Sequence, residues 1–208
     1  NLKNTMNKRI NFFIICLFAI MVSCDSSKKT TNSPNIIILF ADDMGYGDLS
    51  CYGHPNIETE NLDKMADEGI RFTSFYAAAP VCTPSRAALL TGRYPIRNAP
   101  NNFGPESEKG LPLDEITIAD VLSEKGYKTM AIGKWHLGHQ PEYLPVSRGF
   151  DSFYGLPYSN DMILPWCPWL TEEDKLFLYE DAVPVKEIGF DQDDLTVNYT
   201  RKATEFIR

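Results

Sequence analysis

Residues 35–43 read NIIILFADD, an almost unbroken apolar run that ends in two carboxylates. Short, Ile-rich runs without polar alternation are typical of strands buried on both faces of a parallel sheet. We therefore expect a strand from Asn35 to Phe40. Asp42 and Asp43 follow its carboxyl end, where open α/β sheets bind their ligands. Adjacent carboxylates suit a hard cation such as Ca²⁺ or Mg²⁺, although paired aspartates are also common in solvated turns.

The segments after this run alternate between helical and extended patterns. Suitable N-caps and terminal glycines indicate helices, and β-branched and aromatic residues indicate strands. We expect helices at residues 59–69, 83–92 and 117–125, and strands at residues 70–77 and 127–132. This order predicts an α/β fold, with a mostly parallel sheet sandwiched by helices.

The C-terminal third gives weaker signals. Residues 149–168 are rich in aromatic residues and proline but show no clear period. From Asp194 onwards, Leu195, Tyr199 and Phe206 recur at mostly helical spacing. This amphipathic stretch runs to the last residue without a stop signal, so we expect the sequence to be cut inside a domain.

Residues 1–23 have the pattern of a signal peptide, with basic residues before an apolar run at 12–22 that is shorter than a membrane-spanning helix normally requires. Residues 21–24, MVSC, resemble a bacterial lipoprotein processing site, in which Cys24 becomes the lipidated first residue. A plain secretory signal is the alternative. Residues 24–33 then form a polar tether. We expect an exported protein, periplasmic or on the cell surface, that reaches the membrane through its lipid anchor.

The charge of the chain argues against nucleic acid as a partner. Its formal net charge is −8, and three of its basic residues lie in the segment that we expect to be removed. The remaining sequence has no basic stripe that could neutralise phosphates.

Cys82 begins the most informative segment, CTPSRAALLTGR at residues 82–93. A helix that starts just after Cys82 directs backbone N–H groups and the positive end of its dipole towards that residue, and Arg86 lies about one turn further on. This arrangement predicts an anion pocket. For a lone cysteine, a buried structural role is the alternative. Cys82 is, however, one of an odd number of cysteines after residue 24, with Cys51 and Cys167, which indicates a thiol with a separate fate.

The same segment resembles the signature of the formylglycine-dependent sulfatases, C-x-P-S-R followed by an apolar helix that ends in T-G-R. The resemblance implies that Cys82 is oxidised after translation to formylglycine, whose hydrated aldehyde is the nucleophile in sulfate ester hydrolysis. It also implies that Arg86 helps to neutralise the sulfate. A geminal diol can expel sulfate by collapsing to the aldehyde, whereas a thiol would be left with a sulfur-linked sulfate.

Residues 126–138, GYKTMAIGKWHLG, are similar to the second sulfatase signature. Lys134 and His136 are two residues apart, so in an extended segment both side chains point to one side, just beyond a strand's end. The resemblance implies that Lys134 binds the sulfate and the formylglycine oxygen, and that His136 stabilises the diol. Taken alone, these residues would be a solvated lysine and a turn histidine.

The resemblance to sulfatases assigns two further groups of residues. Asp42 and Asp43 occupy the positions of two ligands of the family's Ca²⁺, for which Mg²⁺ is the alternative, and converted Cys82 would be a further ligand. Ser159 lies in the segment LPYSND. That segment resembles one in arylsulfatase A relatives, where the serine faces the substrate sulfate.

Residues 34–208 are therefore expected to be the N-terminal part of a catalytic domain with the alkaline-phosphatase-like sulfatase fold, in the arylsulfatase A and N-acetylgalactosamine-6-sulfatase branch. The implied substrate is an aryl or glycan sulfate, and the implied maturation partner is a formylglycine-generating or anaerobic sulfatase-maturating enzyme. A phosphonate or phosphate ester hydrolase and a non-catalytic lipoprotein that binds sulfated glycans remain as alternatives. The family's later metal and catalytic residues are not in this sequence, so we expect it to be inactive alone.

Overall fold

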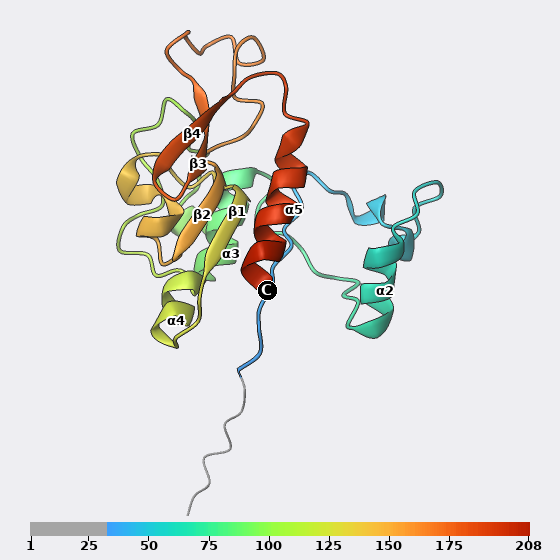
Figure 1. The fold of residues 1–208 in the computed structure, drawn as a ribbon. Helices are drawn as coiled ribbons and strands as arrows, with labels where there is room; N and C mark the ends of the chain where they lie inside the picture. The colour runs from blue at the N-terminus through green and yellow to red at the C-terminus, as the bar shows by residue number, and fades with distance from the viewer. Residues whose placement is uncertain (1–32) are drawn as a thin grey trace, which may run out of the picture. The chain divides into compact units, whose positions relative to one another are not determined.

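The computed structural model describes residues 33–208 (Figure 1). The predicted signal peptide and lipidated Cys24 lie outside the described residues, as does nearly all of the tether at 24–33, so these assignments stay predictions. The described residues divide into two units, 33–43 and 44–208. Within residues 33–208, no helix is long and apolar enough to cross a membrane.

In the first unit, residues 33–40 form neither helix nor strand, and Ile37 and Leu39 are 62% and 75% exposed. The predicted buried strand at residues 35–40 is therefore wrong for this structure. A strand exists only as part of a hydrogen-bonded ladder. The strands of the described sheet all come from the second unit. Apolar composition made this segment suitable for a strand without specifying a partner for it.

The second unit is built on a four-stranded sheet in the order β1-β2-β3-β4. β1 (Met130–Lys134) pairs in parallel with β2 (Ser152–Leu156), whereas β3 (Leu176–Glu180) and β4 (Val183–Ile188) continue the sheet in antiparallel. The long crossover at residues 135–151 permits a parallel pair, while the short link between β3 and β4 allows only a hairpin. The α/β class is confirmed, but the described sheet is mixed rather than mostly parallel.

The helices occupy most of the predicted positions. The α-helices are α2 (Glu60–Glu68), α3 (Cys82–Thr91), α4 (Ile118–Glu124) and α5 (Asp194–Ile207), and the short 3₁₀ helices are η1 (Tyr46–Asp48), η2 (Ser50–Tyr52), η3 (Pro95–Arg97), η4 (Pro141–Tyr143) and η5 (Pro145–Ser147). Gly92 ends α3 in the left-handed conformation, with φ of 66°. Thr117 caps α4 by accepting a hydrogen bond from the backbone N–H of Asp120.

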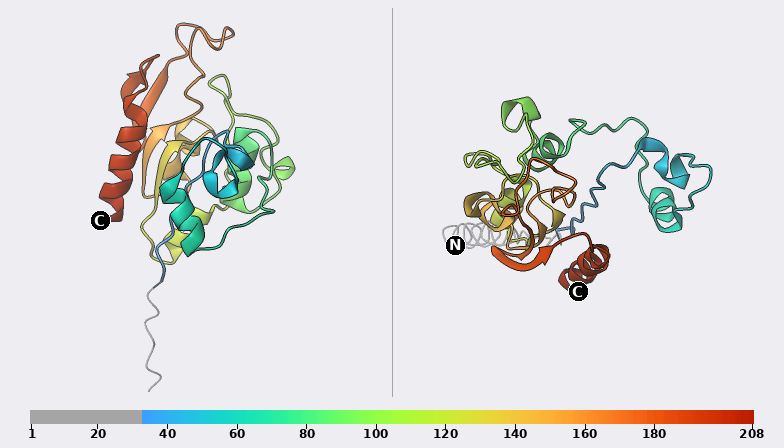
Figure 2. Two further views of the ribbon diagram at one scale, coloured as in Figure 1. Left: turned by 90° about the vertical axis from the view of Figure 1, so that its right-hand side faces the viewer. Right: turned by 90° about the horizontal axis from the view of Figure 1, so that it is seen from above.

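Two hydrophobic clusters cover opposite faces of the sheet, because successive side chains of a strand alternate. Phe153 of β2 belongs to a cluster with Ala87 of α3. The next residue, Tyr154, belongs to a second cluster, against which the partly buried Tyr199 of α5 packs. Figures 1 and 2 show α5 running along the sheet. The predicted sandwich of a sheet between helices is thus formed by α3 on one face and α5 on the other.

The predicted strand at residues 70–77 is wrong. These residues contain no regular element, and Phe72 and Phe75 are 59% and 77% exposed. The Phe72 carbonyl accepts a hydrogen bond from the Tyr52 hydroxyl at 2.8 Å instead of joining a ladder. As in the first unit, strand-like composition was not matched by a neighbouring strand.

The predicted strand at residues 127–132 exists but starts three residues later, at Met130. Thr129 is held outside the ladder because its backbone N–H donates to the Asp151 carboxylate at 2.8 Å. The ladder then begins with Met130 opposite Ser152. This shift makes Lys134 the last residue of β1 rather than a residue of the following loop.

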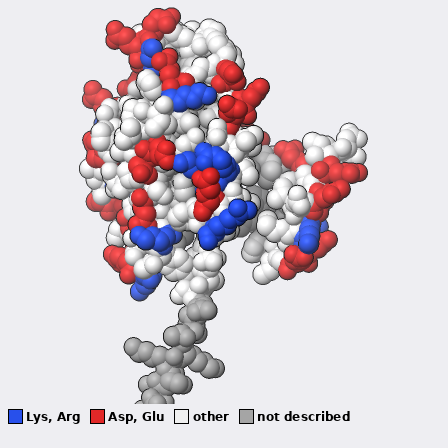
Figure 3. Space-filling view, in the orientation of Figure 1, with Lys and Arg blue, Asp and Glu red and all other residues white. Residues whose placement is uncertain are grey.

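Acidic and basic side chains are interspersed on the face of the molecule drawn in Figure 3. Among the described residues, exposed ion pairs include Lys175 with Glu187 at 3.0 Å and Arg201 with Glu205 at 2.8 Å. Exposed pairs of this kind contribute little to stability. On this face, the side chains give no continuous basic stripe.

Candidate active site

Cys82 is the first residue of α3 and is half-buried. Val81 precedes the helix in an extended conformation and provides no side-chain cap. The sequence suggests Thr83 as the N-cap and Pro84 as the first helical residue, so the predicted start is two residues too late. Cys82 is not in a disulfide. It lies at the positive end of the α3 dipole, where a negatively charged ligand is favoured.

The Thr83 side chain connects α3 to the second signature segment instead of capping the helix. Its hydroxyl donates to the His136 carbonyl oxygen at 2.6 Å and accepts from the backbone N–H of Phe103 at 3.3 Å. Its own N–H donates to Asn102 Oδ1 at 3.3 Å. Thr83 is completely buried. Three segments distant in sequence therefore meet at this one residue.

Arg86 forms a second connection between the two signatures. Its Nη1 donates to the Lys134 carbonyl oxygen at 2.8 Å. Arg86 thus has a structural role in joining α3 to the end of β1, which the sequence did not indicate. Its predicted contact with sulfate stays a prediction.

The chain departs from strand geometry at His136, shortly after the end of β1. The backbone N–H groups of Trp135 and His136 donate to the carbonyl oxygens of Leu156 and Pro157, at 2.9 and 3.0 Å. His136 then adopts a left-handed conformation, with φ of 58°, and is completely buried. The segment is therefore not extended throughout, contrary to the prediction, and the shared direction of the Lys134 and His136 side chains stays a prediction. Left-handed backbone costs a non-glycine residue roughly 1–2 kcal/mol, so neighbouring contacts must hold His136 in place.

Ser159 lies in the loop that follows β2 and is 7% exposed. This loop joins the candidate site because the Pro157 carbonyl binds the His136 N–H. On its other side, Asn160 Nδ2 donates to Gln192 Oε1 at 2.7 Å, and Gln192 Nε2 donates to the Asn160 carbonyl at 2.9 Å. The structure thus brings the segments of four predicted site residues, Cys82, Arg86, Lys134 and His136, together with the Ser159 loop.

The predicted cation ligands lie in the other unit. Asp42 and Asp43 are exposed, and Asp43 has a left-handed backbone, with φ of 53°. Among residues 33–208, no group of three or more His, Cys, Asp or Glu side chains could hold a metal ion. The oxygen donors of the pair suit Ca²⁺, but they would supply two of the roughly six to eight ligands that it takes. The cation site stays a prediction.

Several residues that organise this site gave no recognisable signal in the sequence. Asn102 lies in a loop rich in proline, glycine and asparagine, where an asparagine normally indicates only a turn. His139 is half-buried with its ring edge-on to Tyr158, at 5.9 Å between centroids. Burial lowers the pKa of the His139 imidazole, partly offset by Glu106, which favours the neutral ring at pH 7.

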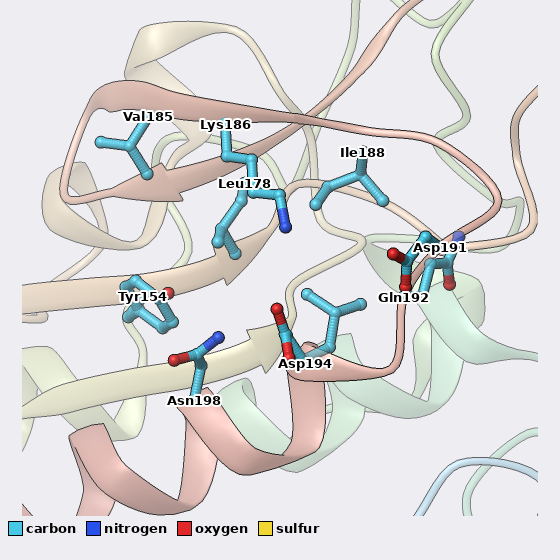
Figure 4. Close-up of a pocket in the computed structure, with 10 residues that line it drawn as sticks. Tyr154, Leu178, Val185, Lys186, Ile188, Asp191, Gln192, Asp194 and Asn198 are labelled. Atoms are coloured by element: carbon cyan, nitrogen blue, oxygen red, sulfur yellow. The ribbon is translucent and has the colours of Figure 1, made fainter.

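A pocket of about 140 Å³ lies on the opposite side of the sheet, between α5 and strands β2 to β4 (Figure 4). Tyr154 and Asn198 line one end, and Figure 4 shows the Lys186 amine directed into the space. None of the predicted site residues lines this pocket. Because Tyr154 belongs to the α5 face and α3 covers the other, the pocket is separate from the candidate site.

Comparisons with known proteins agree with the two signatures. The family model described as Sulfatase matches residues 34–206. Arylsulfatase A of Homo sapiens is 51% identical over 147 residues, which cover 69% of this chain and 29% of that protein. Arylsulfatase G of Canis lupus familiaris is 42% identical over 219 residues, covering 94% of this chain and 41% of that protein. The chain therefore spans less than half the length of these relatives.

A similar solved structure is the crystal structure of Ps i-CgsB. It superposes with a TM-score of 0.71 at 37% identity, covering 84% of this chain and 41% of that one. A second solved structure, in complex with its substrate D-glucosamine-2-N,6-O-disulfate, gives a TM-score of 0.58 at 31% identity and covers 81% of this chain and 31% of that one. The fold of the described residues is thus shared with these solved proteins.

Proposed function

Since the chain belongs to the sulfatase family, we propose that the whole protein hydrolyses sulfate monoesters, with Cys82 converted to formylglycine as its nucleophile. One observation carries this proposal. Cys82 lies at the start of α3, and Thr83 and Arg86 of that helix donate hydrogen bonds to the backbone of the segment that contains Lys134 and His136. The two signatures, far apart in sequence, are therefore joined directly by hydrogen bonds.

The chemistry follows from these residue types. Once converted and hydrated, residue 82 supplies one hydroxyl that attacks sulfur and breaks the S–O bond to the alcohol of the ester, and the proton that this hydroxyl loses is balanced by the proton that the departing alcohol takes up. Deprotonation of the second hydroxyl then forms the aldehyde and breaks the C–O bond to sulfate, which leaves, and water hydrates the aldehyde again. Lys134 and Arg86 would bind the sulfate and stabilise the charge that develops on its oxygens. His136 would hold the second hydroxyl and receive its proton, which the ring can do only when it is neutral. Ser159 would donate to a sulfate oxygen.

Asp42 and Asp43 would hold a Ca²⁺ ion with ligands from elsewhere in the protein. The cation would act as a Lewis acid that polarises a sulfate oxygen. Adjacent carboxylates repel each other unless a cation joins them, which supports this assignment for the pair.

We further propose a sulfated glycan as the substrate. One of the similar solved structures is in complex with D-glucosamine-2-N,6-O-disulfate, and another with k-i-k-neocarrahexaose. An exported, lipid-anchored protein would meet such a glycan outside the cytoplasm. A formylglycine-generating or anaerobic sulfatase-maturating enzyme would convert Cys82 beforehand.

The test uses the full-length protein, produced together with a maturation enzyme. Cys82→Ala should lower the turnover of an aryl sulfate by on the order of 10⁴-fold or more, as for loss of other covalent nucleophiles. Cys51→Ala is the matched control, because Cys51 lies beside α2 and its backbone N–H binds Asp63. Equal rates for Cys82→Ala and the wild type would refute the proposal. Faster turnover of a phosphonate ester than of any sulfate ester would instead identify the protein as a phosphonate ester hydrolase.

A further inference from the structure

Thr83 occupies the variable position of the C-x-P-S-R signature, yet its side chain is completely buried and fully engaged. The hydroxyl has a single proton, with which it donates a hydrogen bond to the His136 carbonyl oxygen at 2.6 Å. The same oxygen accepts the Phe103 N–H at 3.3 Å. The Thr83 hydroxyl therefore forms hydrogen bonds with one backbone carbonyl and one backbone N–H at a position that solvent does not reach.

The acceptor of this hydrogen bond is an unusual residue. His136 has a left-handed backbone although it is not a glycine, and it is completely buried. Such a conformation persists only where the surroundings hold it. Its N–H is bound by the Pro157 carbonyl and its carbonyl by Thr83, so one hydrogen bond fixes each side of the strained residue.

We propose that Thr83 is a positioning residue for the hydrolysis of sulfate esters, which holds the backbone of His136 at a fixed place relative to Cys82. This inference rests on the proposed function. Thr83 directly follows Cys82 in the first turn of α3, so its hydroxyl links the nucleophile's helix to the histidine with a single side chain. Loss of that hydroxyl would allow His136 to relax towards ordinary backbone angles and move its ring.

The expected effect is on turnover rather than on substrate binding. Sulfate binding depends on the charges of Lys134 and Arg86, which remain, and the Arg86 bond to the Lys134 carbonyl does not involve Thr83. A displacement of about 1 Å in a catalytic group lowers the rate by about 100-fold. Thr83→Val, which has the same shape without the hydroxyl, should therefore lower kcat by roughly 10- to 100-fold with a much smaller change in KM.

The experiment measures kcat and KM of the full-length protein for Thr83→Val, Thr83→Ser and Thr204→Val. Thr83→Ser keeps the hydroxyl and should retain most of the wild-type kcat. Thr204→Val is the matched control, because Thr204 is an exposed threonine of α5 whose hydroxyl binds carbonyls of its own helix. Mass spectrometry of the peptide containing residue 82 reports the converted fraction, and rates are expressed per converted, folded molecule.

A wild-type kcat per converted molecule in Thr83→Val would overturn the positioning role, and so would an equal loss in Thr83→Ser. If Thr83→Val does not accumulate in folded form, Thr83→Ala is measured in its place, with the same two opposing outcomes. The proposed function fails separately, when Cys82→Ala keeps its rate whatever Thr83 does.

Discussion

Gly155 is the residue where a single added methyl group should separate the two strands that carry the candidate site. Gly155 of β2 lies opposite Gly133 of β1 in the parallel register. A Cβ on Gly155 would lie 2.0 Å from the Gly133 carbonyl oxygen and 2.7 Å from its carbonyl carbon and its nitrogen. All of these are backbone atoms, so no side-chain rotation relieves the overlap. Overpacking in a well-packed interior costs about 1–3 kcal/mol, and more where backbone must move.

Thermal and urea unfolding of the full-length protein measure this effect. Gly155→Ala should lose at least about 2 kcal/mol of unfolding free energy. Gly189→Ala is the matched control, because a Cβ there meets nothing within 4 Å. It should be neutral or gain up to about 1 kcal/mol by restricting the unfolded chain. Turnover should also fall in Gly155→Ala, since β1 ends at Lys134 and is followed closely by His136. Equal stability of the two variants would refute the close packing of β1 against β2.

Two further predictions concern residues that position neighbouring elements. Thr117→Ala removes the cap of α4, for which a loss of about 1 kcal/mol of stability is typical. It also removes the hydrogen bond of 2.9 Å that the Thr117 hydroxyl donates to the Arg148 carbonyl oxygen. The unfolding free energy of Thr117→Ala should therefore be clearly lower than that of Thr204→Ala, the exposed control. The Thr129 backbone N–H and Lys128 hold the pKa of the Asp151 carboxyl below its usual range, so its stabilising contribution is present above the unfolded pKa of about 3.9 and is lost as the pH falls through the lower folded value. As the pH falls below about 5, the unfolding free energy of Asp151→Asn should therefore decrease less than that of the wild type. Parallel profiles of unfolding free energy against pH for the two proteins would contradict this reasoning.

The helices were predictable because their signals are local. Thr117 caps α4 and Gly92 ends α3 within a turn of their own positions, and Thr59 occupies the N-cap position of α2 without a side-chain capping bond. Strands depend on partners far away in the sequence. The apolar run at residues 35–40 and the aromatic run at residues 70–77 have strand composition but join no ladder here. β3 and β4 pair as a hairpin, although proline lies within β4.

The sequence proposed residues for the candidate site but could not indicate how their segments are connected. The two signatures identified Cys82, Arg86, Lys134 and His136 without indicating how they are joined. Thr83 and Arg86 connect the two segments by donating hydrogen bonds to the backbone carbonyl oxygens of His136 and Lys134. Every residue has a backbone carbonyl, so the acceptor leaves no mark in the sequence. The left-handed backbone of His136 was hidden for the same reason, because it depends on tertiary contacts rather than on the residue type.

The chemical state of residue 82 shows whether formylglycine forms, and it can be measured on the full-length protein purified from a host that has the maturation enzyme. Mass spectrometry of the tryptic peptide should show the Cys82 thiol replaced by an aldehyde, with Cys51 and Cys167 still present as thiols in the same sample. We expect an aldehyde at residue 82 and at no other cysteine position. An intact thiol at residue 82 in a protein that still hydrolyses sulfate esters would contradict it.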